Sequence, residues 1–387
     1  MLHPYGVDPT EDVLVAAGEI SAKVAAPRAA AVDSSADFPS DTVDALRRQG
    51  FLGLCVAREL GGRGAGPRTF AAVTEELAMS CPSSAMIYVM HVTAAQAIAS
   101  SAILRNRDDL LRQIAEGKHL TTLAFSEKGS RSQFWSPVSR LEEDDGHYVT
   151  TASKSWVTAA GHADSYVSSS QKPDAQSSLE STVYLVRKST DGVRVSSSFN
   201  GLGLRGNDSS PIDFERVTIA RDDLISASGD GPTTILQVVL PWFAVGTAAM
   251  ANGICRAAVT RTAEHLSTAG FEHKGALLRD LPTLRARLAQ MSVRTDQSRA
   301  LLGYTLSHLE QPSDITPLYV LEARLAALEA AVDVTDLAMK ACGGAAFSRH
   351  LPLERYFRDA RAGWVMAPTV DHLNDFIGRA LTGMPLF

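Results

Sequence analysis

The sequence predicts an α+β protein in which an N-terminal helical domain, a middle β-domain and a C-terminal helical bundle follow one another. Alanine-rich segments with helical periodicity fill roughly the first 120 residues. Short β-prone segments separated by Gly, Asp, Asn and Ser then run to about residue 219, which is typical of a small barrel or sandwich. Helical periodicity returns from about residue 232 and persists. We therefore expect domains at 1–120, 121–231 and 232–387.

The N-terminal domain contains a helix that is predicted to lie inside the protein. Residues 83–98 are apolar on nearly every side, so no face of this helix suits contact with water. The segment carries His91, and a lone histidine on an apolar helix is more often a satisfied core side chain.

Eight short segments make up the predicted β-domain. Turn-forming residues separate them, and the Ser-rich stretch 168–181 is polar enough to form an exposed hairpin loop. The segments are residues 120–126, 138–141, 147–151, 156–158, 165–170, 182–187, 193–196 and 212–219.

Three long helices are predicted for the C-terminal bundle, at 244–265, 281–310 and 318–342. Gly343 and Gly344 follow the last one, where glycine commonly ends a helix. The longest apolar run, 236–250, contains Pro241 and is too short to span a bilayer. Because the N-terminus also has no basic and apolar leader, we expect a cytoplasmic protein with no membrane partner.

Composition excludes several other classes of function. The chain has 387 residues and a net charge of −6, with no Lys/Arg-rich run, so nucleic acid is not an expected partner. Its four cysteines show no CxxC spacing. We therefore predict neither a disulfide framework nor a metal site.

Four motifs, in the right order, resemble those of the acyl-CoA dehydrogenase family. The segment from Ala124 to Ser132 is similar to the family's Thr-Glu-Pro-Gly-x-Gly-Ser-Asp, and Lys154-Ser-Trp-Val-Thr is very close to its Lys-x-Trp-Ile-Thr. Gly203-Leu-Arg-Gly matches its Gly-x-Arg-Gly, and the segment that begins at Arg355 contains its Arg-Asp-Ala-Arg/Lys. The resemblance covers nearly the whole chain and implies the family's fold, with a four-helix bundle at the C-terminus.

The resemblance also implies FAD as the cofactor. An isoalloxazine ring needs hydrogen-bond partners for its heteroatoms and flat apolar surface for its faces, which a protein supplies from rigid strand ends. Two motifs would provide these contacts here. The residues implied are Phe125, Ser126, Trp156, Val157 and Thr158.

Three further residues are implied to contact FAD. Gly343 and Gly344 would let the backbone approach the pyrophosphate, in this family usually across a subunit interface, although a plain helix end explains them equally well. Thr369 is the third residue of the family's Glu-Gly-Thr tripeptide and is expected near the cofactor.

The tripeptide itself departs from the family pattern. Its Glu is commonly the catalytic base, and the matching residues here are Ala367, Pro368 and Thr369. Alanine cannot take a proton. Some family members place a carboxylate on the helix after the β-domain instead, and the comparable stretch, 236–246, holds none. Both familiar positions for the base therefore lack one.

Three side chains are candidates to replace that base. His91 lies where family members often line the acyl pocket, so it could also contact substrate. Asp371 and His372 follow Thr369 within one helical turn. Asp371 has a simpler interpretation, since an acidic residue in a first turn stabilises the helix.

Other motif residues have less direct roles by resemblance. Ser132 corresponds to a residue that lines the acyl-thioester pocket. Arg358 with Asp359 resembles a structural ion pair, and Glu127 corresponds to a mainly structural residue.

A third departure from the family pattern, after the tripeptide and the missing carboxylate at 236–246, lies in the motif that contacts the FAD pyrophosphate. The family usually has Arg-x-x-Phe-Gly before its next long helix, and residues 267–279 match it poorly, with Phe271 or Lys274 as stand-ins. Losing one charge-assisted phosphate contact weakens binding by roughly 1.5–3 kcal/mol. We expect FAD to be held loosely, or flavin to be diffusible.

Three functions remain open. The first is flavin-dependent oxidation of an acyl thioester, on CoA or an acyl carrier protein in specialised metabolism, with a relocated base. The second is a flavin monooxygenase that uses O₂ and reduced flavin, supplied by a flavin reductase. The third is non-redox binding of an acyl or carrier partner, against which the well-kept motif around Trp156 argues. The resemblance implies a homodimer or homotetramer.

Overall fold

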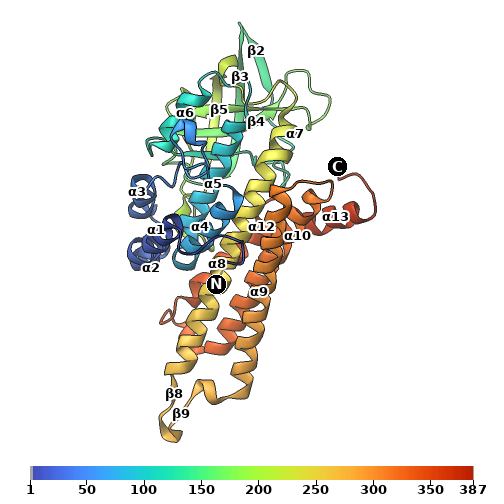
Figure 1. The fold of residues 1–387 in the computed structure, drawn as a ribbon. Coiled ribbons are helices and arrows are strands. Elements are labelled where there is room, and N and C mark those ends of the chain that lie inside the picture. The colour runs from blue at the N-terminus through green and yellow to red at the C-terminus, as the bar shows by residue number, and fades with distance from the viewer. Residues whose placement is uncertain (1–2, 387) are drawn as a thin grey trace.

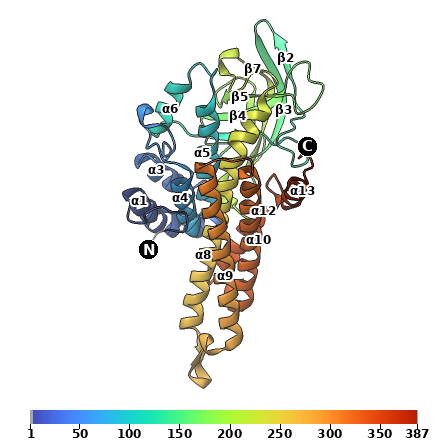
Figure 2. The same ribbon diagram turned by 45° about the vertical axis from the view of Figure 1, so that its right-hand side comes forward.

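A computed structural model describes residues 3–386 and shows the predicted order of helices, strands and helices (Figure 1). The β-domain lies over one end of the long C-terminal helices, and the N-terminal helices pack along the side of that same end (Figures 1 and 2). The N-terminal helices are α1 (Asp12–Ile20), α2 (Ala26–Ser35), α3 (Ser40–Arg48), α4 (Pro67–Ser80), α5 (Pro82–Ser100) and α6 (Arg107–Ala115).

Helix α5 confirms the predicted buried segment. It begins at Pro82, where the missing N–H of proline costs no helical hydrogen bond. Nearly all of its residues are buried, between α4, α8 and strand β1 (Thr121–Ala124). This burial follows from its composition, because an all-round apolar helix must lie inside a core.

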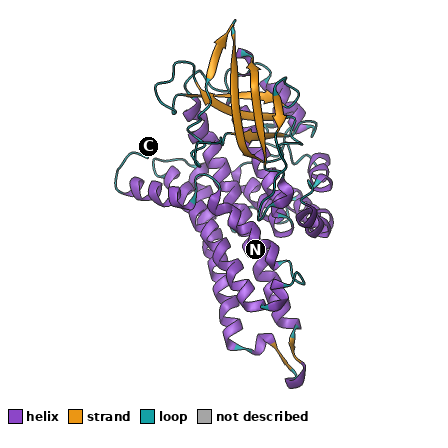
Figure 3. Cartoon of the chain, turned by 180° about the vertical axis from the view of Figure 1, so that it is seen from behind, coloured by secondary structure: helices purple, strands orange, loops and turns teal. Residues whose placement is uncertain are grey.

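The middle region consists of two sheets, seen from behind in Figure 3. One has the order β1-β4-β5 and the other β2-β3-β7-β6. Strands β1 and β4 are parallel, and the remaining pairs are antiparallel. The other strands are β2 (Leu141–Asp144), β3 (His147–Val157), β4 (Ser165–Gln171), β5 (Ser181–Arg187), β6 (Val193–Val195) and β7 (Ser210–Ile219).

Three predictions for this region were wrong in detail. The stretch 168–181 is an exposed loop only in part, because Ser168, Ser169 and Ser170 lie in β4 and are fully buried. The strand expected at 138–141 begins only at Leu141, as β2. The segments expected at 147–151 and 156–158 form the single strand β3, which pairs with β7 over most of its length. The polar residues between them alternate with buried ones, which is the period of a strand with one solvated face.

The C-terminal region confirms the three long helices and adds shorter ones. Helices α8, α9, α10 and α12 pack as a bundle, and the two-stranded hairpin of β8 (Gly270–Phe271) and β9 (Ala276–Leu277) caps its far tip (Figure 1). The helices are α7 (Gly231–Thr234), α8 (Leu240–Thr268), α9 (Pro282–Glu310), α10 (Thr316–Cys342), α11 (Gly344–Phe347), α12 (Leu353–Val365) and α13 (Val370–Leu381).

The helix that contains Pro241 is longer than the apolar run at 236–250. A π-helical turn, Ile235–Val239, joins α7 to α8, so that the helix passes through Pro241 without ending. A wider turn next to a proline accommodates its missing N–H. The resulting helix, Gly231–Thr268, is long and apolar enough to cross a membrane by length and composition, and 61% of its apolar window is buried. It is a core helix of this fold.

Candidate functional site

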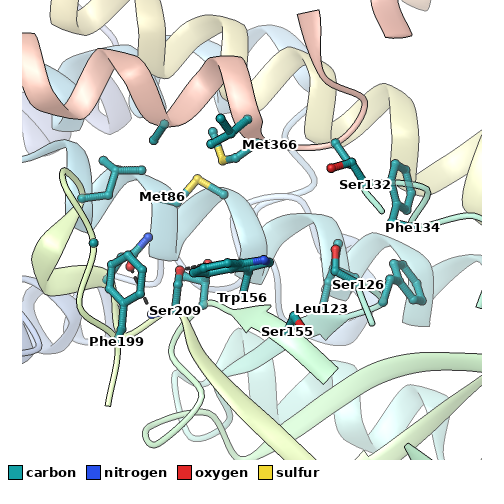
Figure 4. Close-up of a pocket in the computed structure, with 18 of the residues that line it drawn as sticks. Met86, Leu123, Ser126, Ser132, Phe134, Ser155, Trp156, Phe199, Ser209 and Met366 are labelled. Atoms are coloured by element: carbon teal, nitrogen blue, oxygen red, sulfur yellow. Dashed lines mark hydrogen bonds between the residues drawn. The ribbon is translucent and has the colours of Figure 1, made fainter. Parts of the chain in front are cut away.

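A cavity of about 1090 Å³ opens between the β-domain, α5, α8 and the end of α12. One wall comes from the ends of β1 and β3, and it is partly polar. The opposite wall comes from helices and carries apolar side chains such as Met86 and Met366 (Figure 4). Arg358 and Arg361 of α12 also line the cavity. The residues of the polar wall include Phe125, Ser126, Ser155, Trp156, Thr158 and Ser209, and those of the apolar wall include Met86, Met90, Val239, Phe243, Met366 and Ala367.

Trp156 presents a flat aromatic surface to this cavity. The β3–β7 register shifts between Lys154 and Val157, and Trp156 has a φ of 57°, which is unusual for a bulky side chain. This irregularity turns the indole out of the strand, so that 68% of the residue is exposed, while Val157 beside it is buried. Backbone strain at a solvent-facing aromatic residue is typical of a binding site.

Hydroxyl groups and a second ring surround the indole. The Thr158 hydroxyl lies 3.1 Å from the Ser209 hydroxyl, and both side chains are buried at the cavity wall. The Phe199 ring stands edge-on to the indole, with 6.4 Å between ring centroids. The wall therefore combines one exposed aromatic face with fixed hydrogen-bonding groups.

A buried ion pair fixes the two strand ends against each other. Lys154 Nζ lies 2.5 Å from Glu127 Oε1 and donates to the Ser169 carbonyl at 2.6 Å. Burial raises the pKa of the Glu127 carboxyl, but the Lys154 ammonium outweighs this and holds it below its usual value. The Ser155 N–H donates to the Ser126 carbonyl at 2.8 Å. These contacts hold the Ser126 and Trp156 segments in one wall and leave Glu127 a structural carboxylate.

The exposed edge of the cavity is positively charged. Lys128 and Arg131 line it, and no carboxylate of the described residues lies within 4.0 Å of either cation. Arg131 and Ser132 are consecutive residues with positive φ, at 49° and 66°, which curls this loop at the cavity edge. Such an edge suits an anionic group such as a phosphate.

Carboxylates are scarce inside the cavity. Among the described residues that line it, Glu127 is the single acid, and its partner is Lys154. Ala367 does line the cavity and presents a methyl group there. No histidine belongs to the described lining.

His91 does not reach the cavity, contrary to the expectation that it contacts substrate or acts as a base. It is fully buried, its Nε2 lies 3.0 Å from the Leu52 carbonyl, and the Thr121 N–H donates to its Nδ1 at 3.1 Å. This geometry fits the neutral ring with the proton on Nε2. Burial lowers the pKa of His91 to about 4. The ring links α5 to β1, and each of its two nitrogens has a backbone hydrogen-bond partner.

The residues predicted after position 367 also lie outside the cavity lining. Thr369 caps α13 by accepting the His372 N–H, and its hydroxyl lies 3.0 Å from His372 Nδ1. The His372 ring packs edge-on against Trp135 at 5.7 Å between centroids. Asp371 is exposed in the first turn of α13, where its charge favours the helix.

The glycine pair serves locally as a helix end. Gly343 follows α10 with a φ of 54° and a ψ of −130°, a conformation that only glycine adopts readily. Both glycines are exposed and neither lines the cavity. A contact of Gly343 and Gly344 with a cofactor held by a second copy remains a prediction.

Arg358 does not pair with Asp359 as expected. Its guanidinium binds Asp33 at 2.6 Å and Glu354 at 2.8 Å. Neighbouring residues on α12 point in different directions, so Asp359 instead accepts the Leu204 N–H at 2.6 Å. Burial raises the pKa of Asp359 to about 7. Asp359 thus ties α12 to the β-domain.

Arg324 is a residue near the cavity that sequence reasoning missed. It is fully buried in α10, behind Phe243 and Met366, which line the cavity. A signal was present, because Arg324 occupies an otherwise apolar helical stripe with Val320 and Ala327.

Models of known protein-domain families match all three regions of this chain. The acyl-CoA dehydrogenase N-terminal domain matches residues 10–118, the middle domain matches 122–217 and the C-terminal domain matches 229–382. The three models succeed one another along the chain in the order of the observed architecture. The protein is an oxidoreductase of the FAD flavoprotein class. It belongs to the acyl-CoA dehydrogenase family.

Individual relatives agree with this assignment at moderate identity. The probable acyl-CoA dehydrogenase FadE25 of Mycobacterium tuberculosis is 25% identical over 370 residues, 94% of this chain and 92% of the relative. The short-chain specific acyl-CoA dehydrogenase of Clostridium acetobutylicum is 26% identical over 340 residues, 87% of this chain and 88% of the relative. The structure of butyryl-CoA dehydrogenase from Megasphaera elsdenii superposes with a TM-score of 0.91 at 22% identity, covering 97% of this chain and 98% of that one.

Proposed function

We propose that this protein oxidises an acyl thioester and that FAD, when bound, accepts the electrons. The observation that carries the proposal is the cavity itself, in which the exposed Trp156 indole faces an arm lined by Met86 and Met366 (Figure 4). A flat aromatic wall suits the flavin ring, and an apolar arm of this kind suits an acyl chain. The named family relatives at 25–26% identity support the same class of substrate.

The residues present fit FAD at the ring and leave its phosphates to other groups. Trp156 would cover one face of the isoalloxazine, and the Thr158–Ser209 pair would offer a hydroxyl to its edge. Phe271 and Lys274 do not line the cavity, since their hairpin lies at the far tip of the bundle (Figure 1). Lys128 and Arg131 are the nearer candidates for a phosphate of FAD, CoA or a carrier's pantetheine arm.

The proposed reaction has no base at position 367, so the α-proton would leave to solvent water at the open cavity. Ala367 supplies a methyl group to the cavity, and Glu127 is held by Lys154. A base introduced at this position should therefore accelerate oxidation of a saturated, neutral acyl thioester. We expect Ala367→Glu to raise the anaerobic rate of flavin reduction by roughly 10²–10⁴-fold. Ala367→Gln is the matched control, because it has the same size and cannot take the proton. Equal rates in the two variants would contradict the proposal.

The reaction class is tested with the purified protein. A yellow flavin spectrum should bleach when an acyl-CoA is added without oxygen. Absence of bleaching, together with oxygen-dependent turnover when a flavin reductase supplies reduced flavin, would replace dehydrogenation by monooxygenation. Failure to bind flavin at any concentration would remove both.

The monooxygenase alternative is kept for one reason. An oxygenating flavoprotein needs no base for an α-proton, and the described cavity lining offers none that is unpaired. Membership in an oxidoreductase family favours either redox reaction over simple acyl or carrier binding.

Assembly and location are part of the proposal. We expect a homodimer or homotetramer in the cytoplasm, with Gly343 and Gly344 reaching the FAD of a second copy. The exposed glycines and Phe347, which is 82% exposed beside them, support such a contact.

A further inference from the structure

Arg324 is an uncompensated charge beside the apolar arm of the cavity. No part of the residue is exposed, and no carboxylate of the described residues lies within 4.0 Å of its guanidinium. Its Nη2 donates to the Met366 carbonyl at 3.1 Å, while Nε and Nη1 have no protein partner. The guanidinium carbon lies 4.8 Å from the centre of the Phe243 ring.

Such an arrangement is costly for a purely structural side chain. Arginine stays charged in proteins, and burial without a carboxylate leaves the cost of desolvation unanswered. Burial lowers the pKa of Arg324 to about 9, which still leaves the group cationic at neutral pH. A methionine or leucine would pack in this apolar stripe without that cost. A carboxylate on a bound ligand would compensate the charge of the guanidinium.

The residues in contact with Arg324 also line the cavity. Phe243 and Met366, which touch the guanidinium, both line the cavity, and so does Ala367, the residue after Met366. Ala367 leaves room at the cavity wall that a longer side chain would fill. The ring of Phe243 stands over the guanidinium and lines the cavity, so this ring lies between the cavity and Arg324.

We infer that the acyl group of the substrate carries a carboxylate, and that Arg324 binds it at the end of the arm between Phe243 and Ala367. Guanidinium and carboxylate would form a charge-assisted, two-point contact shielded from water. This inference rests on the proposed function for the thioester at the flavin end, and it adds the substrate class: the monothioester of a dicarboxylic acid.

The test compares acidic and neutral thioesters of equal chain length. Malonyl-, succinyl- and glutaryl-CoA are paired with propionyl-, butyryl- and valeryl-CoA, and binding is followed by isothermal titration of the FAD-loaded protein. We expect at least one acidic member to bind more tightly than its neutral partner. Arg324→Met should weaken that acidic ligand by about 10- to 100-fold and leave the neutral one within about threefold. Arg324→Lys should recover part of the loss.

A second buried arginine provides the control. Arg355 on α12 is also buried, has an unpartnered Nε and does not line the cavity. Arg355→Met should leave the preference for the acidic ligand intact. Thermal melting separates the alternatives further, because removing an uncompensated charge at Arg324 should not lower the melting temperature. A lower melting temperature with unchanged ligand preference would make Arg324 structural and overturn the inference.

Flavin bleaching distinguishes this inference from the proposed function. Bleaching by neutral and acidic thioesters alike, in wild type and in Arg324→Met, would keep the oxidation and refute the carboxylate site. Arg324-dependent binding of an acidic thioester without bleaching would keep the site and refute the oxidation.

Discussion

Replacing Trp156 by alanine should weaken FAD binding without unfolding the protein. The residue is 68% exposed, so of an indole surface of roughly 250 Å² about 170 Å² is open, and a stacked ring would cover about half of that. Burial of about 85 Å² at ~25 cal/mol per Å² contributes about 2 kcal/mol. We therefore expect the Kd for FAD to rise about 30-fold. The apoprotein should keep its stability, since an exposed side chain contributes little to the core.

The measurement is a titration of apoprotein with FAD, followed by flavin fluorescence. Trp364→Ala is a matched control, because Trp364 is also exposed, at 45%, but does not line the cavity. Trp156→Phe should retain most of the affinity, since it keeps an aromatic face. A Kd for Trp156→Ala within about threefold of wild type, or an equal loss in Trp364→Ala, would refute the stacking role.

Three further predictions concern stability. The pKa of His91 is about 4 in the fold against 6.5 in a free side chain, so the unfolded chain binds more protons between these values. Stability is complete above pH 6.5 and falls by up to about 3 kcal/mol toward pH 4, and urea titrations of His91→Gln should lack this loss. The pH dependence of stability that comes from Asp359 has the opposite sign, because its pKa of about 7 in the fold exceeds the usual 3.8. The free energy of unfolding should fall as pH rises through that window, and Asp359→Asn, which can still accept the Leu204 N–H, should flatten the profile. Lys154→Met leaves Glu127 buried and unpaired, which should cost about 3–5 kcal/mol in denaturant unfolding, and a second change, Glu127→Gln, should recover part of it. Unchanged pH profiles or a stable Lys154→Met would contradict these assignments.

Most of the fold could be predicted from the sequence because its elements are locally encoded. The long helices α9 and α10 begin and end within two residues of their predicted bounds, and Gly343 ends α10 as its position indicates. The β-segments were found in order, with one strand divided in two and one placed three residues too early. Local periodicity does not reveal that the polar residues between two β-segments belong to the same strand, because their pairing with β7 decides this.

The candidate site was predicted in part. Phe125, Ser126, Ser132, Trp156 and Thr158 do line one cavity, since their motifs follow directly from strand ends that two sheets bring together. Proximity in sequence gave a wrong prediction for the residues that follow Ala367. Residues shortly after Ala367 enter a new helix and turn away from the cavity.

The sequence by itself determined the family, the order of helices and strands, and the alanine at position 367. Only the tertiary structure decided which polar groups find partners. His91 is satisfied by Leu52 and Thr121, which lie 39 and 30 residues away, while Arg324 is left without a carboxylate beside the cavity. Periodicity records whether a side chain is buried, but its chemical role depends on the atoms that distant segments bring to it, and those are set by packing.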